Sequence, residues 1–228
     1  AGAILSMADR FDTLAGLFSI GLIPTGSKDP YGLRRAAFGL VSIAVARRWR
    51  LDWRPVVRKA LSLYSAASEP AHERILSELE TFFAERLRNL LERRGHSYDE
   101  ISAVLNVGVW DFADAADRAE ALSQARREID FRSLVLAFKR IRNIVGAEAA
   151  GAPADSAPLP SAELYRERAE RRLAADFLQA RTSIQELAAS RRYREAMGMI
   201  ASIAPSLDQF FVEVLVNAPE EDLRRNRL

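Results

Sequence analysis

The stretch that decides the fold is Ile75–Gly95, with the sequence ILSELETFFAERLRNLLERRG. Its apolar residues recur at spacings of three and four, which places them on one side of an α-helix. They are Ile75, Leu79, Phe82, Leu87, Leu90 and Leu91. Gly95 follows the last of them, where a glycine favours the end of a helix. This stretch therefore predicts one long helix with a single buried face.

The same helical pattern extends in both directions from this stretch. No alternation of apolar and polar residues reaches the length of a strand, and no Asn-Gly or Asp-Gly pair joins two apolar runs. We expect further helices at residues 3–20, 29–48, 52–67, 98–105, 111–127, 130–145, 161–189, 193–203, 206–216 and from 219 onward. The sequence thus predicts an all-α fold made of one or more helical bundles.

Individual residues mark several of the helix ends. Asp29 followed by Pro30 predicts a helix start at this pair, because aspartate caps a first turn and proline fits its first position. Ser97 begins a Ser-Tyr-Asp-Glu sequence with the spacing of a capping box. Ser161 is predicted to cap the helix that follows a Pro-rich linker at 148–160. Pro205 predicts a break, because proline lacks the amide that an interior helical position needs.

Composition sets the class of protein. With 228 residues, of which 49% are hydrophobic, the chain is long enough for one sizeable core or two small ones. It has no cysteine, which excludes disulfides, Cys-based zinc sites and thiol catalysis. No apolar run approaches the roughly 18–20 residues that span a bilayer, so we expect a soluble, cytoplasmic protein. The chain opens without Met inside an apolar helix, and we expect it to be a fragment of a longer polypeptide.

Basic residues are almost all arginine and are unevenly distributed. Only three of the 33 are lysines, Lys28, Lys59 and Lys139. Arginine contacts phosphates with a planar fork, although the codon usage of a GC-rich genome explains the same bias. Residues 31–60 contain eight basic residues and a single acidic residue, Asp52. Such segregation predicts attraction to a polyanion even though the net charge is only +2.

Two carboxylates near the start of the chain are a candidate metal site. Asp9 and Asp12 are three positions apart and therefore share a helix face. Phosphohydrolases of the HD type end their metal-ligand set with an aspartate in a similar Ala-Asp context, but they also need histidines placed earlier in the chain. Because so little sequence precedes Asp9, we expect a solvated pair and no metal site.

The turn at residues 24–30, PTGSKDP, is a candidate phosphate site. A glycine-containing turn that leads into a helix N-terminus can cradle a phosphate; Lys28 lies within this turn, and Arg34 and Arg35 follow it in the sequence. The spacing of a Walker loop is missing. An ordinary structural loop explains the same residues, so both interpretations stay open.

The helix predicted at 130–145 has two chemically different sides. The side expected to be buried carries Leu134, Phe138, Ile141 and Val145. The opposite side carries Arg132, Lys139 and Asn143, flanked by Arg140 and Arg142. No acidic residue interrupts the stretch between Arg132 and Val145. Such a side suits contacts to RNA phosphates plus an amide that reads a base edge; an ordinary solvated face is the alternative.

The sequence shows no catalytic constellation. His72 and His96 lie near predicted helix ends, where we expect them to be exposed. The G-x-S-x-G and S-x-x-K motifs of serine nucleophiles are missing. We therefore predict no self-sufficient active site in this chain.

Four stretches carry recurring motifs. Residues 8–14 read A-D-x-x-D-T-L, and residues 24–37 read P-x-G-x-K-D-P followed by L-R-R-A-A. Residues 138–144, FKRIRNI, contain a K-R-[I/V]-x-N-I element, and the C-terminal residues contain F-F-x-x-V-x-V at 210–216 and L-R-x-N-R-L at 223–228. Together, and at this spacing, these motifs resemble the C-terminal part of the β subunit of bacterial glycyl-tRNA synthetases.

The resemblance implies two helical domains and a division of labour. Residues 1–68 are implied to be the end of an HD-like domain, and residues 69–228 an anticodon-binding bundle similar to that of arginyl-tRNA synthetases. In this family glycine activation, with ATP and Mg²⁺, belongs to a separate α subunit, while the β subunit supplies tRNA contacts. The resemblance thus implies a subunit of glycine–tRNA ligase that binds tRNA-Gly and the α subunit, with no cofactor in this chain and no DNA or membrane partner.

The matched motifs also imply which residues meet the tRNA anticodon arm. These are Arg132, Lys139, Arg140, Arg142 and Asn143, followed by Arg224, Asn226 and Arg227. Two alternatives stay open. One is the remnant of an HD-type metal-dependent phosphohydrolase, and the other is a scaffold that docks the α subunit without touching RNA.

Overall fold

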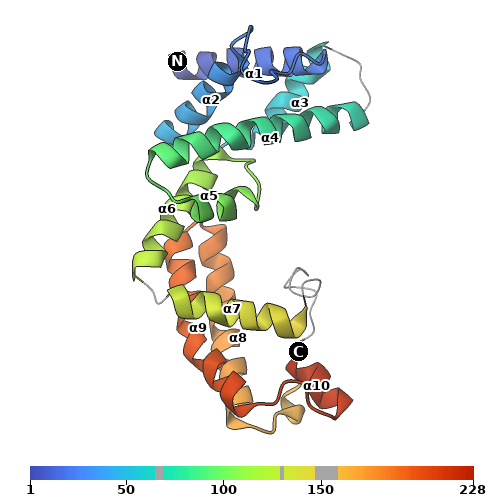
Figure 1. Cartoon of the computed structure of the whole chain (residues 1–228), viewed down its shortest axis with the longest axis vertical. Helices are drawn as coiled ribbons and strands as arrows, with labels where there is room; N and C mark the ends of the chain where they lie inside the picture. Colours follow the sequence, from blue (N-terminus) through green and yellow to red (C-terminus); the bar gives the residue numbers. More distant parts are fainter. Residues whose placement is uncertain (65–68, 129–130, 147–158) are drawn as a thin grey trace. The chain divides into compact units, whose positions relative to one another are not determined.

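The computed structural model of this chain describes residues 1–64, 69–128, 131–146 and 159–228. Within these ranges it contains ten α-helices, one short 3-10 helix and no strand (Figure 1). The predicted all-α fold class is therefore confirmed. The chain forms two compact units, unit 1 at residues 1–123 and unit 2 at residues 124–228. None of the helices in the described ranges combines the length and the apolar character needed to cross a bilayer.

Unit 1 is organised around one long helix. It contains α1 (Gly2–Ser19), α2 (Leu33–Arg47), α3 (Trp53–Tyr64), α4 (Glu69–Arg93), α5 (Tyr98–Leu105) and the larger part of α6 (Phe112–Glu128). Helix α4 contacts α1, α2, α3 and α5, and α1 also packs against α2 and α3. The stretch that predicts the long helix is thus the element on which four other helices of unit 1 pack.

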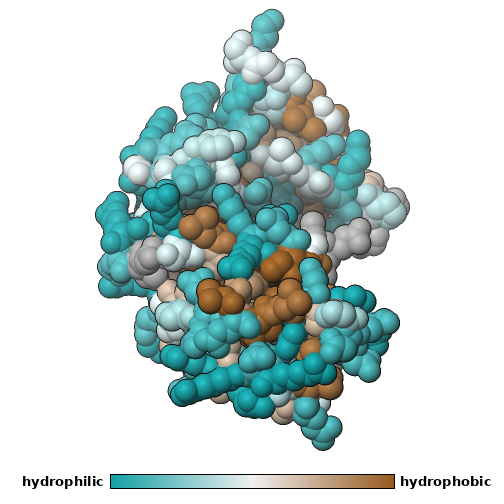
Figure 2. All heavy atoms as spheres, turned by 60° about the horizontal axis from the view of Figure 1, so that its bottom comes forward, coloured by the Kyte–Doolittle hydropathy of each residue, from teal (hydrophilic) through white to brown (hydrophobic). Residues whose placement is uncertain are grey.

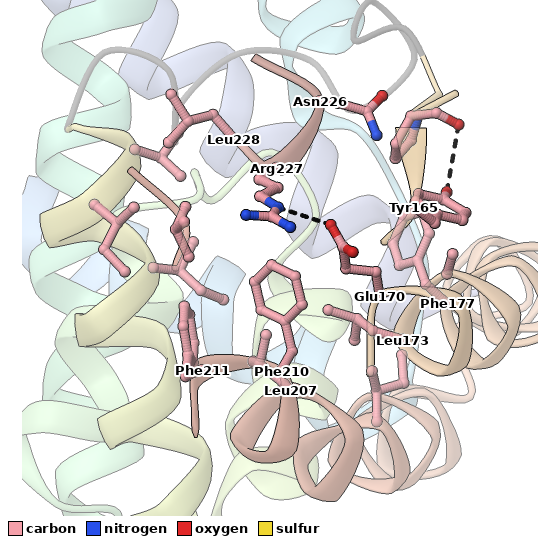
Figure 3. A pocket seen from close by; sticks show the side chains of 17 residues that line it. Tyr165, Glu170, Leu173, Phe177, Leu207, Phe210, Phe211, Asn226, Arg227 and Leu228 are labelled. Atoms are coloured by element: carbon pink, nitrogen blue, oxygen red, sulfur yellow. Dashed lines mark hydrogen bonds and ion pairs between the residues drawn. The ribbon is translucent and has the colours of Figure 1, made fainter. Parts of the chain in front are cut away.

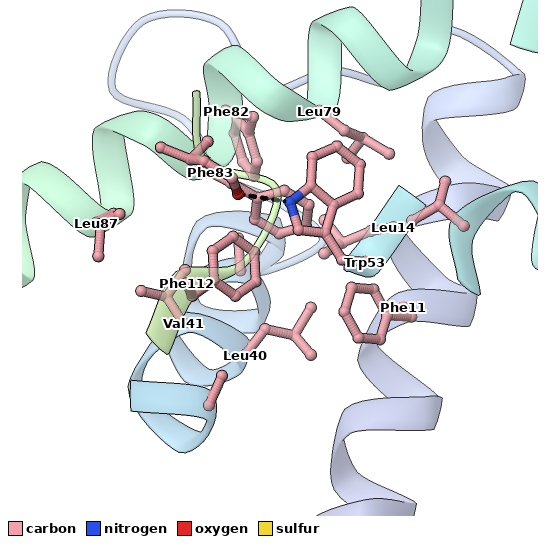
Figure 4. Packing of buried hydrophobic residues seen from close by; sticks show 14 of the residues in the cluster. Phe11, Leu14, Leu40, Val41, Trp53, Leu79, Phe82, Phe83, Leu87 and Phe112 are labelled. Atoms are coloured by element: carbon pink, nitrogen blue, oxygen red, sulfur yellow. Dashed lines mark hydrogen bonds between the residues drawn. The ribbon is translucent and has the colours of Figure 1, made fainter. Parts of the chain in front are cut away.

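Trp53 lies at the centre of the core of unit 1 (Figure 4). Its buried indole makes an edge contact with Phe83 at 5.0 Å and stacks on Phe112 at 6.4 Å between ring centroids. The indole N–H donates a hydrogen bond of 2.8 Å to the carbonyl of Val109. Burial of the large ring is favourable because its one polar group has a partner. This cluster ties α3 to α4 and to the segment that joins α5 and α6.

Unit 2 is smaller and more loosely packed. It contains the end of α6, then α7 (Phe131–Val145), the 3-10 helix η2 (Ala162–Leu164), α8 (Arg168–Ala189), α9 (Tyr193–Glu213) and α10 (Glu221–Arg227). Helices α8 and α9 lie side by side, and α7 packs against α9 (Figure 1). The buried cluster of this unit consists of Ala169, Phe210, Val214 and Val216. Four such side chains make a small core for a unit of this length.

The start of α2 differs from the prediction. The helix begins at Leu33, because Gly32 before it adopts a left-handed conformation with φ 67°. The carboxylate of Asp29 still accepts hydrogen bonds from the amides of Leu33 at 2.8 Å and Arg34 at 3.0 Å. The predicted helix start at Asp29-Pro30 is therefore wrong, whereas Asp29 does satisfy amides of the first turn.

Two predicted helix boundaries in unit 2 are also wrong. Helix α9 runs through Pro205 as one element, because its packing against α7 and α8 outweighs the loss of one backbone hydrogen bond. The long helix expected from Ser161 begins instead at Arg168, after η2. Glu167 and Glu170 form the capping box there. In contrast, the capping box predicted at Ser97 is confirmed at α5.

The compact units divide the chain at a different place from the expected domains. The division falls inside α6, between Ser123 and Gln124, and α4 packs against α1, α2, α3 and α5 of unit 1. Most of the linker predicted at 148–160 lies outside the described residues; Leu159 and Pro160 are exposed. The assignment of residues 1–68 to an HD-like domain stays a prediction.

Candidate nucleic-acid interface

Helix α7 carries most of the side chains predicted to meet RNA. Ala137 is buried, and Ile141 and Ile144 are half-buried on the side that faces the rest of unit 2. Phe138, in contrast, is 57% exposed, so the predicted buried stripe is wrong at this residue. Consecutive helical residues are about 100° apart around the axis, and Phe138 is therefore turned away from the face that Ala137 buries.

The exposed side of α7 combines cations with an aromatic ring. Arg132, Lys139, Arg142 and Asn143 are all exposed, as predicted for a binding face. Lys139 and Arg142 line a hollow of about 330 Å³ together with Phe131, Leu134, Val135 and Phe138. Cationic groups beside an exposed ring suit an unstacked nucleic-acid base with its phosphates, because the ring stacks on the base while the cations neutralise charge.

Arg140 has a different role from its neighbours on α7. Its guanidinium lies 4.3 Å from the ring centroid of Phe211, and its Nη2 donates a hydrogen bond of 3.1 Å to the Phe211 carbonyl. Phe211 belongs to α9. Arg140 therefore fixes α7 to α9, and with it the position of Lys139 and Arg142.

The residues predicted near the C-terminus make contacts within unit 2. Asn226 binds the backbone of Ser161 twice: its Oδ1 accepts from the amide at 2.6 Å and its Nδ2 donates to the carbonyl at 3.2 Å. Arg227 pairs with Glu170 at 2.7 Å, with the two side chains 7% and 3% exposed. Arg227 also donates to the carbonyl of Leu215 at 3.0 Å. Both residues thus hold α10 in place, while Arg224 is half-buried.

The ion pair of Arg227 and Glu170 determines the charge state of the carboxylate. Burial raises the pKa of Glu170, but hydrogen bonds from the Arg227 guanidinium and from the amides of Glu167 and Arg166 outweigh burial. The net result is a pKa below the ordinary value, so Glu170 is ionised near neutral pH.

A cavity of about 410 Å³ lies beside this ion pair (Figure 3). Its walls are mostly apolar and come from α7, α8, α9 and α10; they include Leu173, Phe177, Leu207, Phe210 and Phe211. Phe177 is 43% exposed, and Val212 and Leu215 are 82% and 66% exposed. On the face shown in Figure 2, hydrophobic side chains gather in patches bordered by hydrophilic ones. Exposed apolar surface of this kind is typical of a protein with a binding partner.

The first amides of α2 are not free to bind a phosphate at the turn before this helix. The amides of Leu33 and Arg34 are already bonded to the Asp29 carboxylate. The Arg34 guanidinium is bonded to the carbonyls of Gly26 at 2.6 Å and Lys28 at 3.0 Å, and so holds the turn closed. Lys28 and Arg35 are exposed. The structure thus supports the interpretation of residues 24–30 as a structural loop.

The histidines differ from the prediction, because neither side chain is exposed. His72 is 8% exposed, and the side chain of His96 is 6% exposed. Nδ1 of His96 lies 3.0 Å from Oγ of Ser123, which donates to Oε2 of Glu100 at 2.8 Å. The hydroxyl proton of Ser123 therefore points to a carboxylate and not to a histidine base, which is the arrangement of a structural network.

Asp9 and Asp12 lie exposed on α1. Asp12 accepts a hydrogen bond of 2.5 Å from the hydroxyl of Tyr64. In the described ranges, no three His, Asp or Glu side chains come together in a way that could hold a metal ion.

Sequence reasoning missed the internal partners of the predicted cations. Phe211 and Glu170 come from α9 and α8, far from Arg140 and Arg227 in the sequence. For Glu170 a signal was present, because Glu167 and Glu170 have capping-box spacing and mark the true start of α8. For Phe211 no local signal exists.

The comparison with known proteins agrees with this arrangement. Residues 1–106 match the family described as "Glycyl-tRNA synthetase beta subunit", and residues 134–228 match the "DALR anticodon binding domain". Glycine–tRNA ligase beta subunits of Geobacter metallireducens and Geotalea daltonii are 41% and 38% identical to the chain over its whole length. The corresponding subunit of Nitratidesulfovibrio vulgaris is 40% identical.

The chain spans about a third of the length of these curated relatives, 32% to 33%. The two family matches leave only residues 107–133 between them. The relatives match the chain from end to end, across both units. Over its whole length, the chain is similar to the β subunits of glycyl-tRNA synthetases.

Proposed function

We propose that this chain is the tRNA-binding part of a glycine–tRNA ligase β subunit and that unit 2 binds the anticodon arm of tRNA-Gly. One observation carries the proposal. The anticodon-binding match begins at residue 134, within α7, and α7 is the helix that exposes Lys139, Arg142 and Phe138 around one hollow.

The binding mechanism follows from the chemistry of this face. Lys139, Arg142 and Arg132 neutralise phosphates of the anticodon arm, which makes the affinity fall with salt. Phe138 offers a ring on which an unstacked loop base stacks, and Asn143 offers an amide that bonds a base edge. Arg140 acts through Phe211, since it holds the binding helix against α9.

The proposal assigns the chemistry of aminoacylation to a separate α subunit. That subunit would use ATP and Mg²⁺, and this chain would hold the tRNA so that its acceptor end reaches the α active site in the cytoplasm. The name of the relatives supports a partner subunit, because they are β subunits of a ligase. The phosphohydrolase alternative is not favoured, since Asp9 and Asp12 are exposed and all these relatives are named as ligase subunits.

A charge reversal on α7 tests the proposal. We expect Lys139→Glu to weaken binding of tRNA-Gly about tenfold in a gel-shift or anisotropy titration, with a shallower salt dependence. Lys59→Glu is the matched control, because Lys59 is an exposed lysine on α3 of unit 1. Equal affinity for tRNA-Gly and unrelated tRNA, unchanged by Lys139→Glu, would count against the proposal. No protection of the tRNA in a footprint would favour the RNA-free scaffold.

A further inference from the structure

A second cationic surface lies in unit 1 and consists of residues other than those assigned to the anticodon arm. Helices α2 and α4 pack together and form an open hollow of about 430 Å³ at the surface. The side chains that line this hollow include Arg34, Arg35 and Phe38 of α2 and Arg86, Asn89 and Arg93 of α4. Four arginines and one asparagine thus line the same open hollow.

The spacing along each helix explains this convergence. Arg86, Asn89 and Arg93 occur at i, i+3 and i+7 on α4, which places them on one face. Arg34 and Phe38 occur at i and i+4 on α2. Because α2 packs against α4, the two cationic faces meet at the same hollow.

The cations at this hollow are only partly compensated. Arg86 is 6% exposed and pairs with the exposed carboxylate of Glu85 at 2.6 Å. Burial lowers the pKa of Arg86 and the charge of Arg34 lowers it further, while Glu85 and Asp29 act in the opposite direction. Asp29, the other acid close to this group, is bonded to the amides at the start of α2. Like charges placed together at low dielectric favour the arrival of an anion.

Several of these side chains are already fixed in position. Carbonyls of Pro24, Gly26 and Lys28 accept three of the five N–H groups of Arg34, which leaves donors of that guanidinium for a further acceptor. The guanidinium of Arg93 lies over the ring of Phe38 at 5.1 Å. An anion that binds here therefore meets groups that lose little conformational freedom.

We propose that the hollow between α2 and α4 is a phosphate-binding site and that its ligand is a phosphodiester of the RNA backbone. Guanidinium forks match the geometry of phosphate oxygens, and Asn89 adds a neutral donor. The site would give the bound RNA a contact on unit 1 that is separate from the α7 face. The RNA as source of the phosphate rests on the proposed function; the anion site itself does not.

The test uses the whole chain and two exposed arginines of the hollow. We expect Arg35→Ala with Arg93→Ala to weaken tRNA-Gly binding and to reduce the slope of log affinity against log salt by about one, as for the loss of one phosphate contact. Arg94→Ala is the matched control, since Arg94 is the exposed residue directly after the end of α4 and does not line the hollow. Circular dichroism verifies that each variant is folded. A double variant with the affinity and slope of Arg94→Ala would overturn the proposal.

A second readout separates this proposal from the anticodon-arm proposal. Inorganic pyrophosphate is expected to raise the melting temperature of unit 1 in the wild type and in Lys139→Glu, but not in the Arg35/Arg93 double variant. If the chain binds no tRNA and this pyrophosphate effect persists, the anion site stands and its ligand is a free phosphate compound. If pyrophosphate has the same effect on all variants, or none, the site is refuted whatever the RNA result.

Discussion

Unit 1 and unit 2 are both all-helical, but they bury their apolar side chains to different extents. The core of unit 1 contains fully buried Trp53, Phe18 and Phe83 in edge and stacking contacts. The buried cluster of unit 2 contains one aromatic ring, Phe210, and a cavity of about 410 Å³ remains beside it. Unit 1 is thus stabilised mainly by packing, whereas unit 2 depends more on specific polar contacts.

The difference supports the proposal that unit 2 is the unit that binds a ligand. Unit 2 is held together by Arg140 on Phe211, by Asn226 on Ser161 and by the buried pair of Arg227 and Glu170. These contacts leave apolar and cationic side chains of α7 at the surface. A unit that keeps such side chains exposed is suited to complete its packing with a ligand, and a unit with a closed core is suited to present charge on a fixed frame.

The largest expected effect tests the packing of unit 1. We expect Trp53→Ala to lower the free energy of unfolding of unit 1 by about 3–5 kcal/mol, because it removes the central ring and leaves a cavity. Phe210→Ala in unit 2 is expected to cost about 2 kcal/mol, since the cavity already leaves part of its ring without neighbours. In chemical denaturation, tryptophan fluorescence reports on unit 1, because all three tryptophans (Trp49, Trp53 and Trp110) lie there. Equal costs for the two changes would remove the contrast between the cores.

The next effect tests the polar contacts of unit 2. Arg227→Met is expected to cost about 3 kcal/mol, because it leaves Glu170 charged and buried without its partner. Adding Glu170→Gln should restore part of this loss, because it removes the buried charge and keeps an acceptor for the amides of Arg166 and Glu167. The control is Arg58→Met, which breaks an exposed pair with Glu73 and should cost less than about 1 kcal/mol. Similar costs at both pairs, measured by circular dichroism during denaturation, would contradict the special role of the buried pair.

The same carboxylate predicts the pH dependence of unit 2. The pKa of Glu170 in the folded chain lies below its ordinary value of 4.5. Its contribution to stability is therefore fully present above that value and is lost as the pH falls through the lower, folded pKa. We expect the stability of unit 2 to fall more steeply below about pH 4.5 in the wild type than in Glu170→Gln. Parallel acid-unfolding curves would show that Glu170 is not stabilised by its partners.

The smallest expected effect has opposite signs in the two units. Ala37 of unit 1 is fully buried, so Ala37→Leu should destabilise unit 1 by about 1–3 kcal/mol through overpacking. Ala174 lines the cavity of unit 2, so Ala174→Leu should stabilise unit 2 by about 0.5–2 kcal/mol through cavity filling. Thermal denaturation of the two variants measures both changes. Destabilisation by both substitutions would mean that the cavity of unit 2 is not available for packing.

Local signals in the sequence predicted much of the fold. The spacing in Ile75–Gly95 and the capping box at Ser97 depend on neighbours within one or two turns, and both predictions are confirmed. Pro205 and Ser161 were misleading, because packing of α9 on α8 and the capping box at Glu167 decide those helix ends. Tertiary packing is not visible in a local pattern and overrides it here.

The candidate site was less predictable than the fold. Exposure of Lys139 follows from helical periodicity, and the structure agrees. Asn226 is half-buried because it bonds Ser161, and Arg227 is buried because it pairs with Glu170. Both partners are more than fifty positions away in the sequence, and no spacing rule anticipates such contacts. The same holds for the hollow of unit 1, where α4 adds Arg86 and Arg93 to arginines that the sequence places beside a turn.

A footprint of tRNA-Gly bound to this chain tests the central claim most directly. Hydroxyl-radical cleavage is measured on the free RNA, on the complex, and on complexes with Lys139→Glu and Lys59→Glu. We predict that the chain protects the anticodon loop and that Lys139→Glu abolishes this protection while Lys59→Glu keeps it. An anticodon loop that is cleaved equally in the free and the fully bound RNA would contradict the assignment of α7 as the recognition helix.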